Sequence, residues 1–187
     1  MGADLVNDHT VLSPASRRAI FAPQRREATA QPPERPRRLI GFATPTSRQL
    51  PVATDALPRL QLYGAGVPNV RWQGVFVAYS GRGADQTTTI VFEIAPGNRL
   101  GWRTDQTEET QDIVAGTGEL RRDDATFPVG PGSEFVLPTN VRHDLINTGT
   151  EILRCIAFFG ATMFTQKFDE LMQPVGSHVL GTPNRDG

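Results

Sequence analysis

The sequence predicts an all-β protein, and three observations support that prediction. From about residue 60 the chain consists of short runs rich in β-branched and aromatic residues. Turn residues separate these runs at intervals of about 8–12 residues, a spacing typical of β-sandwiches and barrels. Only residues 164–172 show helical periodicity. We therefore expect a sandwich or barrel with one short helix near its C-terminal end.

The expected strands follow one another between residues 70 and 159. Residues 70–79 form the first and are stopped by a glycine-containing turn. Residues 88–94 are strongly β-branched, and an Ala-Pro-Gly-Asn sequence ends that strand. The remaining strand-like runs are 109–114, 118–122, 135–137, 142–147 and 152–159. The expected helix places its large apolar residues on one stripe: Phe164, Phe168, Leu171 and Met172.

The two ends of the chain differ from this β-rich middle. Residues 1–60 hold nine arginines against five acidic residues, and residues 17–38 contain four prolines. Such a composition buries too little apolar surface to offset its ordering entropy. We expect residues 1–38 to form an extended or disordered arm, either solvated or packed on a neighbouring subunit. Residues 39–173 should form the folded domain, and residues 174–187 a Pro/Gly-rich tail or lid.

Composition and motif searches exclude several classes of protein. The 187 residues suit one domain, and the single cysteine, Cys155, allows no intramolecular disulfide, which fits a cytoplasmic protein. A net charge of −1 does not suggest nucleic-acid binding, and no apolar run is long enough to span a membrane. Nucleotide-binding glycine loops, Cys-x-x-Cys pairs and a serine-nucleophile elbow are absent from the sequence. A three-histidine zinc site would need every histidine of the chain, so it is almost ruled out.

A first ordered set of residues begins at Gly97. Five residues separate Gly97 from the Arg103-Thr104-Asp105 segment. Three residues then separate Asp105 from Glu109, and six separate Glu109 from Gly116. This spacing resembles the first motif of the cupin superfamily, the small double-stranded β-helix (jelly-roll) barrels. The family has a His-x-His pair where this chain has Arg103 and Asp105. The glutamate and both glycines are in register with that motif.

A second set resembles the second cupin motif. Gly132 is followed after five residues by Pro138 and Asn140, then by His143 and Asn147. Only Asn140 departs from the motif, by replacing a glycine, and asparagine tolerates the left-handed conformation of such a turn. Two motifs in register over about 50 residues imply a double-stranded β-helix barrel.

The departure from the family pattern defines the candidate site. Strand alternation places Arg103 and Asp105 on one face, and the resemblance implies that Glu109 and His143 face the same interior. The barrel would then hold one fixed cation, two carboxylates and an imidazole. We interpret His143, Glu109 and Asp105 as catalytic residues and Arg103 as the anchor of an anionic substrate.

Three further residues are candidates, two of them with a simpler alternative. Alternation puts Gln111 on the inward face of Glu109, and Asn147 on that of His143, so both are expected to bind substrate. Asn147 could equally tie down a turn backbone. His178 lies in the glycine-flanked tail and could close over the barrel to add a second imidazole, or remain solvated.

Two interpretations of the charges compete. In the first, which the charge balance favours, Arg103 pairs with Asp105 or Glu109 and no metal or other cofactor is needed. In the second, Asp105, Glu109 and His143 hold a hard divalent ion such as Mn²⁺, Fe²⁺ or Mg²⁺. A dication about 5 Å from Arg103 would be repelled by several kcal/mol even at an effective dielectric constant of about 20.

The residues favour acid–base chemistry on a small molecule. His143 titrates near neutral pH, and Arg103 can stabilise a carboxylate or an enolate. We expect a cupin lyase or isomerase, such as a dehydratase, isomerase or cyclase, in specialised metabolism. The alternatives are a non-catalytic ligand-binding or structural cupin and a hard-metal-dependent oxidoreductase. An extended arm can add a strand to a partner, so we also expect a homodimer whose interface includes residues between 39 and 79.

Overall fold

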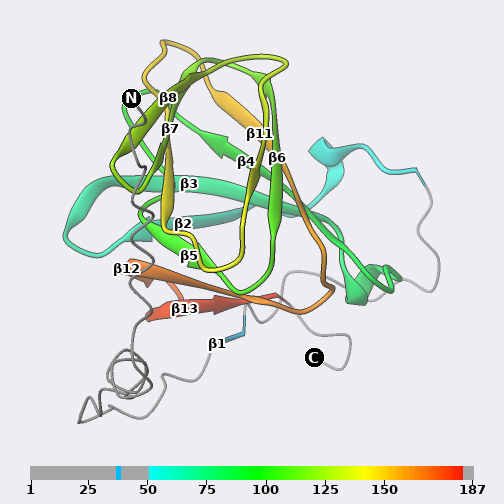
Figure 1. Cartoon of the computed structure of the whole chain (residues 1–187). Helices are drawn as coiled ribbons and strands as arrows, with labels where there is room; N and C mark the ends of the chain where they lie inside the picture. Colours follow the sequence, from blue (N-terminus) through cyan, green and yellow to red (C-terminus); the bar gives the residue numbers. More distant parts are fainter. Residues whose placement is uncertain (1–36, 39–50, 183–187) are drawn as a thin grey trace, which may run out of the picture. The chain divides into compact units, whose positions relative to one another are not determined.

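The computed structural model describes residues 37–38 and 51–182 (Figure 1). The chain divides into two units, Met1–Pro33 and Glu34–Gly187, and all described residues belong to the second. The expected arm of residues 1–38 therefore lies outside the described residues, apart from strand β1 (Arg37–Arg38). Most of the expected dimer interface before residue 51 also lies outside them, and the dimer stays a prediction.

The prediction of an all-β fold is confirmed. Apart from two short 3-10 turns, η1 (Thr54–Ala56) and η2 (Ser80–Arg82), the regular elements of the described residues are all strands. After β1 these are β2 (Leu60–Gly64), β3 (Val67–Ala78), β4 (Thr88–Ile94), β5 (Arg103–Asp105), β6 (Glu109–Ala115), β7 (Gly118–Arg122), β8 (Ala125–Val129), β9 (Glu134–Leu137), β10 (His143–Ile146), β11 (Leu153–Phe159), β12 (Thr165–Gln173) and β13 (Ser177–Gly181). Among these elements, no helix is long and apolar enough to cross a membrane.

The strands curl into a double-stranded β-helix barrel (Figure 1). Their order is β8-β7-β10-β5-β12-β2-β3-β4-β11-β6-β9, with neighbouring strands antiparallel along this path, and β13 added beside β12. This path brings β5 and β10 side by side and leaves β6 on the far side of the sheet order. Curling of the sheet is what returns β6 to the other two, and these three strands carry the candidate site.

The predicted helix at residues 164–172 is wrong, because this segment forms strand β12. Its burial alternates at the start, with Gln166 and Phe168 inward and Lys167 outward. Met172, four residues after Phe168, keeps the same alternation and is buried, although a register irregularity lies between Lys167 and Met172. The apolar residues therefore show helical spacing although the backbone is extended. A polar side chain at the inward position 166 hid the strand period.

The expected boundary at residue 173 is also too early. Ser177–Gly181 form strand β13, which pairs with β12 and, in parallel, with β1. These residues of the expected tail or lid are thus part of the sheet. The described part of the folded domain extends to Thr182, which accepts a hydrogen bond from the backbone N–H of Phe164 at 3.1 Å.

The barrel interior combines an aromatic group with buried charges. The ring centroid of Trp72 lies 5.2 Å from that of Phe92, in an edge-on arrangement, and 6.3 Å from that of Phe168, in a stacked one. The guanidinium carbon of Arg103 lies 5.9 Å from the centroid of the Phe92 ring. A cation over an aromatic face is attracted by the ring quadrupole. The apolar core therefore borders the candidate site directly.

Candidate functional site

Three short segments position the predicted charged residues. Strand β5 carries Arg103 and Asp105 two positions apart, so both point inward. Glu109 is the first residue of β6, and His143 is the first of β10, directly opposite Arg103 in the ladder. Asn140, in the turn before β10, adopts a left-handed backbone with φ of 62°, as its motif position predicts. The tight turns at the strand ends thus deliver all four side chains to one place.

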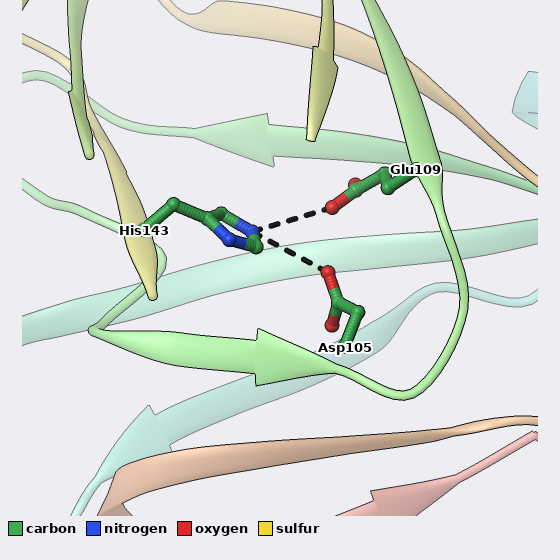
Figure 2. A group of neighbouring side chains, drawn as sticks. All are labelled: Asp105, Glu109 and His143. Atoms are coloured by element: carbon green, nitrogen blue, oxygen red, sulfur yellow. Dashed lines mark ion pairs between the residues drawn. The ribbon is translucent and has the colours of Figure 1, made fainter. Parts of the chain in front are cut away.

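The four side chains converge, and we call them the inner charge cluster. His143 Nε2 lies 3.4 Å from Asp105 Oδ2 and 3.3 Å from Glu109 Oε2 (Figure 2). Arg103 Nη2 lies 3.2 Å from Glu109 Oε2, and Arg103 Nε lies 3.9 Å from Asp105 Oδ1. None of the four residues is more than 2% exposed. The structure therefore places two carboxylates between an arginine and an imidazole, away from solvent.

The hydrogen bonding of His143 fixes its protonation pattern. Its Nδ1 lies 2.9 Å from the carbonyl oxygen of Val141. A carbonyl oxygen only accepts, so Nδ1 carries a hydrogen and donates it. In a neutral ring, Nε2 would then turn its lone pair toward the oxygens of Asp105 and Glu109. That contact is repulsive unless Nε2 is protonated, a carboxyl group is protonated, or a cation lies between them.

The pKa shifts within the inner charge cluster separate the two carboxyl groups. Burial raises the pKa of Asp105, but His143 and Arg103 outweigh burial and hold that pKa well below its usual range. Burial also raises the pKa of Glu109 and Asp105 raises it further, so the pKa of Glu109 stays above its usual value despite Arg103. For His143, burial and Arg103 lower the pKa, yet bonds to Asp105 and Glu109 raise it overall. The two carboxyl groups therefore differ in how readily they are protonated, with Asp105 the more acidic of the two.

Several polar atoms of the site have no hydrogen-bond partner within the described residues. They include the donors Nε and Nη1 of Arg103, together with Asp105 Oδ2 and His143 Nε2. Buried polar groups in native proteins are nearly always paired with protein, water or a ligand. The site therefore offers both donors and acceptors to a further group.

Two glutamines, rather than one, contact the carboxylates. Gln111 of β6 donates from Nε2 to Glu109 Oε1 at 2.7 Å, and Gln166 of β12 donates from Nε2 to Asp105 Oδ1 at 2.9 Å. Gln111 was expected from alternation, although as a substrate-binding residue. Sequence reasoning missed Gln166 because its segment was assigned to a helix. The signal that could have found it is the alternation of Phe164, Gln166 and Phe168.

Asn147 does not join the inner charge cluster. Its amide nitrogen donates to the backbone carbonyls of Ile94 at 2.6 Å and Glu151 at 2.7 Å, and its side-chain oxygen accepts from the N–H of Gly149 at 3.0 Å. Both ends of the amide are therefore committed to backbone. Of the two alternatives for this residue, these contacts support the one in which it ties down a turn.

His178 and Cys155 also lie apart from the proposed chemistry. His178 stands in β13 with Nδ1 3.3 Å from the carbonyl oxygen of Phe168, and it is not among the potential metal-ligating residues that gather within the barrel. It does not provide the second imidazole that a closing tail would have added. Cys155 is a free, fully buried thiol whose pKa is raised by burial and by Glu109. A thiol in that state is a poor nucleophile.

The donor atoms of the inner charge cluster fit a divalent metal ion in number and type. Ligand atoms of Asp105, Glu109 and His143 all lie within 4.8 Å of one another. Two ligands at right angles around an ion at about 2.1 Å are about 3 Å apart, close to the observed histidine–carboxylate distances. Two oxygens and one imidazole suit hard ions such as Mn²⁺, Fe²⁺ or Mg²⁺. Arg103 opposes such an ion by contributing a permanent positive charge beside the same carboxylates.

Comparison with known proteins agrees with the motifs. The family model described as "Cupin domain" matches residues 90–159, which span β4 to β11 and include the whole inner charge cluster. The chain contains a cupin domain. No curated protein sequence matches the chain. The cupin assignment therefore rests on the family model, the fold and the two motifs.

Solved structures share the cupin fold at low sequence identity. A structure of a sugar phosphate isomerase from a cupin superfamily, from Silicibacter pomeroyi, is 17% identical, with 74% of this chain and 94% of that chain covered and a TM-score of 0.53. A predicted oxalate decarboxylase from Thermotoga maritima is 15% identical, with 60% of this chain and 99% of that chain covered and a TM-score of 0.54. At these identities the likeness shows a shared fold and not a shared reaction.

Proposed function

We propose that this cupin is a small-molecule enzyme of the isomerase or lyase type, in which His143 and Glu109 move a proton. The observation that carries the proposal is the position of His143 Nε2, 3.3–3.4 Å from two buried carboxylates whose pKa values shift in opposite directions. Oppositely shifted groups in one buried site are the mark of an acid and a base held ready together.

The charge balance supports a protonated His143 in the resting site. With an imidazolium, the two cations and two anions of the inner charge cluster cancel. Nε2 then donates toward Asp105 and Glu109, which removes the repulsion that a neutral ring would create. In this proposal Asp105 stays ionised and holds the imidazolium, while Glu109 accepts or returns the proton. The site can therefore act as an acid or as a base near neutral pH.

Arg103 is the proposed anchor for the substrate. Its Nε and Nη1 have no hydrogen-bond partner in the described residues, so both remain to bind an anionic oxygen, such as a carboxylate, a phosphate or a developing enolate. The cluster is almost completely buried. Substrate therefore reaches it only when the side chains that cover it move, as in enzymes whose binding step includes an opening of the site.

Solvent deuterium exchange tests this function and does not require the product to be identified. A base that removes a proton next to a carbonyl replaces it from solvent, so an enzyme of this type washes deuterium from D₂O into its substrate. We would incubate the protein with a panel of hydroxy acids, keto acids and sugar phosphates and follow loss of the C–H signal by ¹H NMR. Sugar phosphates are included because one protein of the same fold is named a sugar phosphate isomerase.

The matched control is the second described histidine. We expect exchange with at least one compound in the wild type and in His178→Gln, and a loss of 10²-fold or more in His143→Gln, the size of a general acid–base contribution. Equal exchange in His143→Gln and the wild type would contradict the proposal. So would the absence of exchange across the panel together with no ligand-induced rise in melting temperature, which would favour the non-catalytic alternative that complete burial also suits.

A metal-dependent cupin is the second candidate, because three ligand atoms are suitably placed. Asp105, Glu109 and His143 would hold the ion, which would supply a Lewis acid to polarise a substrate oxygen. With a neutral His143, the inner charge cluster and the dication would together carry one excess positive charge. An anionic substrate would be needed to balance it. The protonated site needs no such balance, and we prefer it for that reason.

A further inference from the structure

We propose that Gln111 and Gln166 form a matched pair of positioning residues that select which oxygen of each carboxylate faces His143. The link between this pair and proton transfer rests on the proposed function. Gln166 comes from a strand that the sequence motifs do not include. Both glutamines are buried, with exposed fractions of 0% for Gln111 and 6% for Gln166.

The contacts of the two carboxylates are equivalent. In Glu109, Oε1 accepts from Gln111 and Oε2 faces His143 Nε2. In Asp105, Oδ1 accepts from Gln166 and Oδ2 faces the same nitrogen. One oxygen of each group is thus bound to an amide, and the other is directed to the imidazole. Because the glutamines come from β6 and β12, the two carboxylates are held by different strands.

The identity of the amide atom at each contact is determined by charge. An amide offers an N–H donor at one end and an acceptor at the other, whereas an ionised carboxylate only accepts. If either amide turned over, its oxygen would face a carboxylate oxygen and be repelled. The N–H of Gln111 and of Gln166 therefore has to point at its carboxylate. A fixed amide in turn limits rotation of that carboxylate about its last bond.

This positioning has a consequence for His143. Nε2 lies almost equally far from Asp105 Oδ2 and Glu109 Oε2, so small rotations of either carboxylate decide which one receives its hydrogen bond. Loss of the Gln166 contact would free Asp105 and shift the imidazole hydrogen bond toward Glu109. Loss of the Gln111 contact would do the reverse. Groups that orient a reacting residue in this way typically change its function by about 10- to 100-fold when removed.

Methionine variants test the pair because methionine has a similar length and volume but no N–H donor. We would prepare Gln166→Met, Gln111→Met and, as the matched control, Gln61→Met on the exposed face of β2. Protein labelled with ¹⁵N-histidine reports the His143 ring at pH 7, with signals assigned through His143→Gln. We expect the His143 Nε2 resonance to move in both buried variants, in opposite directions, and to stay in place in the control.

A second readout separates this proposal from the proposed function. Wherever the wild type exchanges deuterium with a substrate, we expect about 10- to 100-fold slower exchange in Gln166→Met and Gln111→Met. Moved His143 signals in a protein that catalyses no exchange would retain the positioning role and remove the function. Unmoved His143 signals in both variants would overturn the positioning role. If neither variant folds while Gln61→Met does, the glutamines serve the fold alone, which also overturns it.

Discussion

Two charge clusters meet at strand β10, which contributes neighbouring residues to both, and they are built differently. The inner charge cluster includes His143, whereas the next residue of β10, Asp144, belongs to an outer charge cluster with Arg99 and Glu170. In the outer one, Asp144 Oδ2 lies 2.6 Å from Arg99 Nη1 and its Oδ1 accepts from the N–H of Gly101 at 2.8 Å. Arg99 Nη2 also lies 2.9 Å from Glu170 Oε1.

The outer charge cluster is a nearly saturated ion-pair network, whereas the inner charge cluster has more unused bonding capacity. Both oxygens of Asp144 are bonded at short distances, and Arg99 uses both terminal nitrogens. In the inner cluster, Asp105 Oδ2, His143 Nε2 and two nitrogens of Arg103 have no hydrogen-bond partner in the described residues. The outer charge cluster leaves one buried side-chain atom, Glu170 Oε2, without a partner in the described residues, against four in the inner one. Buried groups left unpaired are costly in a network that serves stability. The inner charge cluster is therefore the one we connect with chemistry.

The largest expected effect is that of Arg103→Met. The change leaves two buried carboxylates beside one imidazole, and breaking a buried ion pair from one side costs about 3–5 kcal/mol. Urea unfolding at pH 7 measures this loss. The loss should shrink at pH 5, where Glu109, whose pKa is already raised, is protonated more readily. A loss below about 1 kcal/mol at pH 7 would contradict the role of Arg103 as the cation that balances the site.

Asp144→Asn tests the outer charge cluster and should have the next largest effect. The variant keeps the shape of the side chain but removes its charge from the short contact with Arg99. Hydrogen bonds to charged groups contribute about 1.5–3 kcal/mol, so we expect a loss of that size in the free energy of unfolding. Deuterium exchange with any substrate should stay unchanged. A large loss of exchange with little loss of stability would reverse the roles we assign to the two clusters.

His143 should make stability depend on pH above neutrality. Its pKa is raised above 6.5 in the folded protein, so its protonation stabilises the fold fully below pH 6.5, and this contribution is lost as pH rises through the folded value. The slope can reach about 1.4 kcal/mol per pH unit for one proton. Urea midpoints from pH 6 to 9, in a buffer with chelator, should fall in the wild type and fall less in His143→Gln. Parallel curves would contradict a protonated His143.

Glu109→Gln should have the smallest effect on stability. The pKa of Glu109 is raised above 4.5, so its ionisation opposes folding as pH rises past that value. A glutamine with its oxygen in place of Oε1 could still accept from Gln111 and from Arg103 at the longer of the two Arg103 contacts, and its N–H in place of Oε2 could donate to a neutral His143 Nε2. We expect a change below about 1 kcal/mol at pH 7, by the same urea titration. A loss as large as that of Asp144→Asn would place Glu109 in a purely structural network.

The sequence predicted most of the inner charge cluster because its members are set by spacing. The spacings match the two cupin motifs, so the resemblance to that family implied that Arg103, Asp105, Glu109 and His143 face one interior. The left-handed turn at Asn140 followed from the same register. Asn147 was ambiguous since an asparagine near a turn can bond either to a ligand or to backbone.

Other features were beyond single-sequence patterns for physical reasons. Gln166 is a polar residue at an inward position, and it breaks the alternation that identifies a strand. Strand β5 is only three residues long and mostly polar. Strand β8 contains Pro128, which is tolerated because β8 stands at the end of the strand order and can lack a ladder hydrogen bond. Contacts with neighbouring strands, rather than local sequence, therefore determine that these segments are strands.

Metal content is the measurement that tests the central claim most directly, since the claim is that protons rather than a metal complete the inner charge cluster. We would determine bound metal by elemental analysis in purified wild-type protein, Glu109→Ala and Arg103→Ala. The account predicts less than about one-tenth equivalent of any divalent ion per chain in the wild type, and no fall in Glu109→Ala. One equivalent in the wild type, lost in Glu109→Ala and retained or tightened in Arg103→Ala, would contradict it.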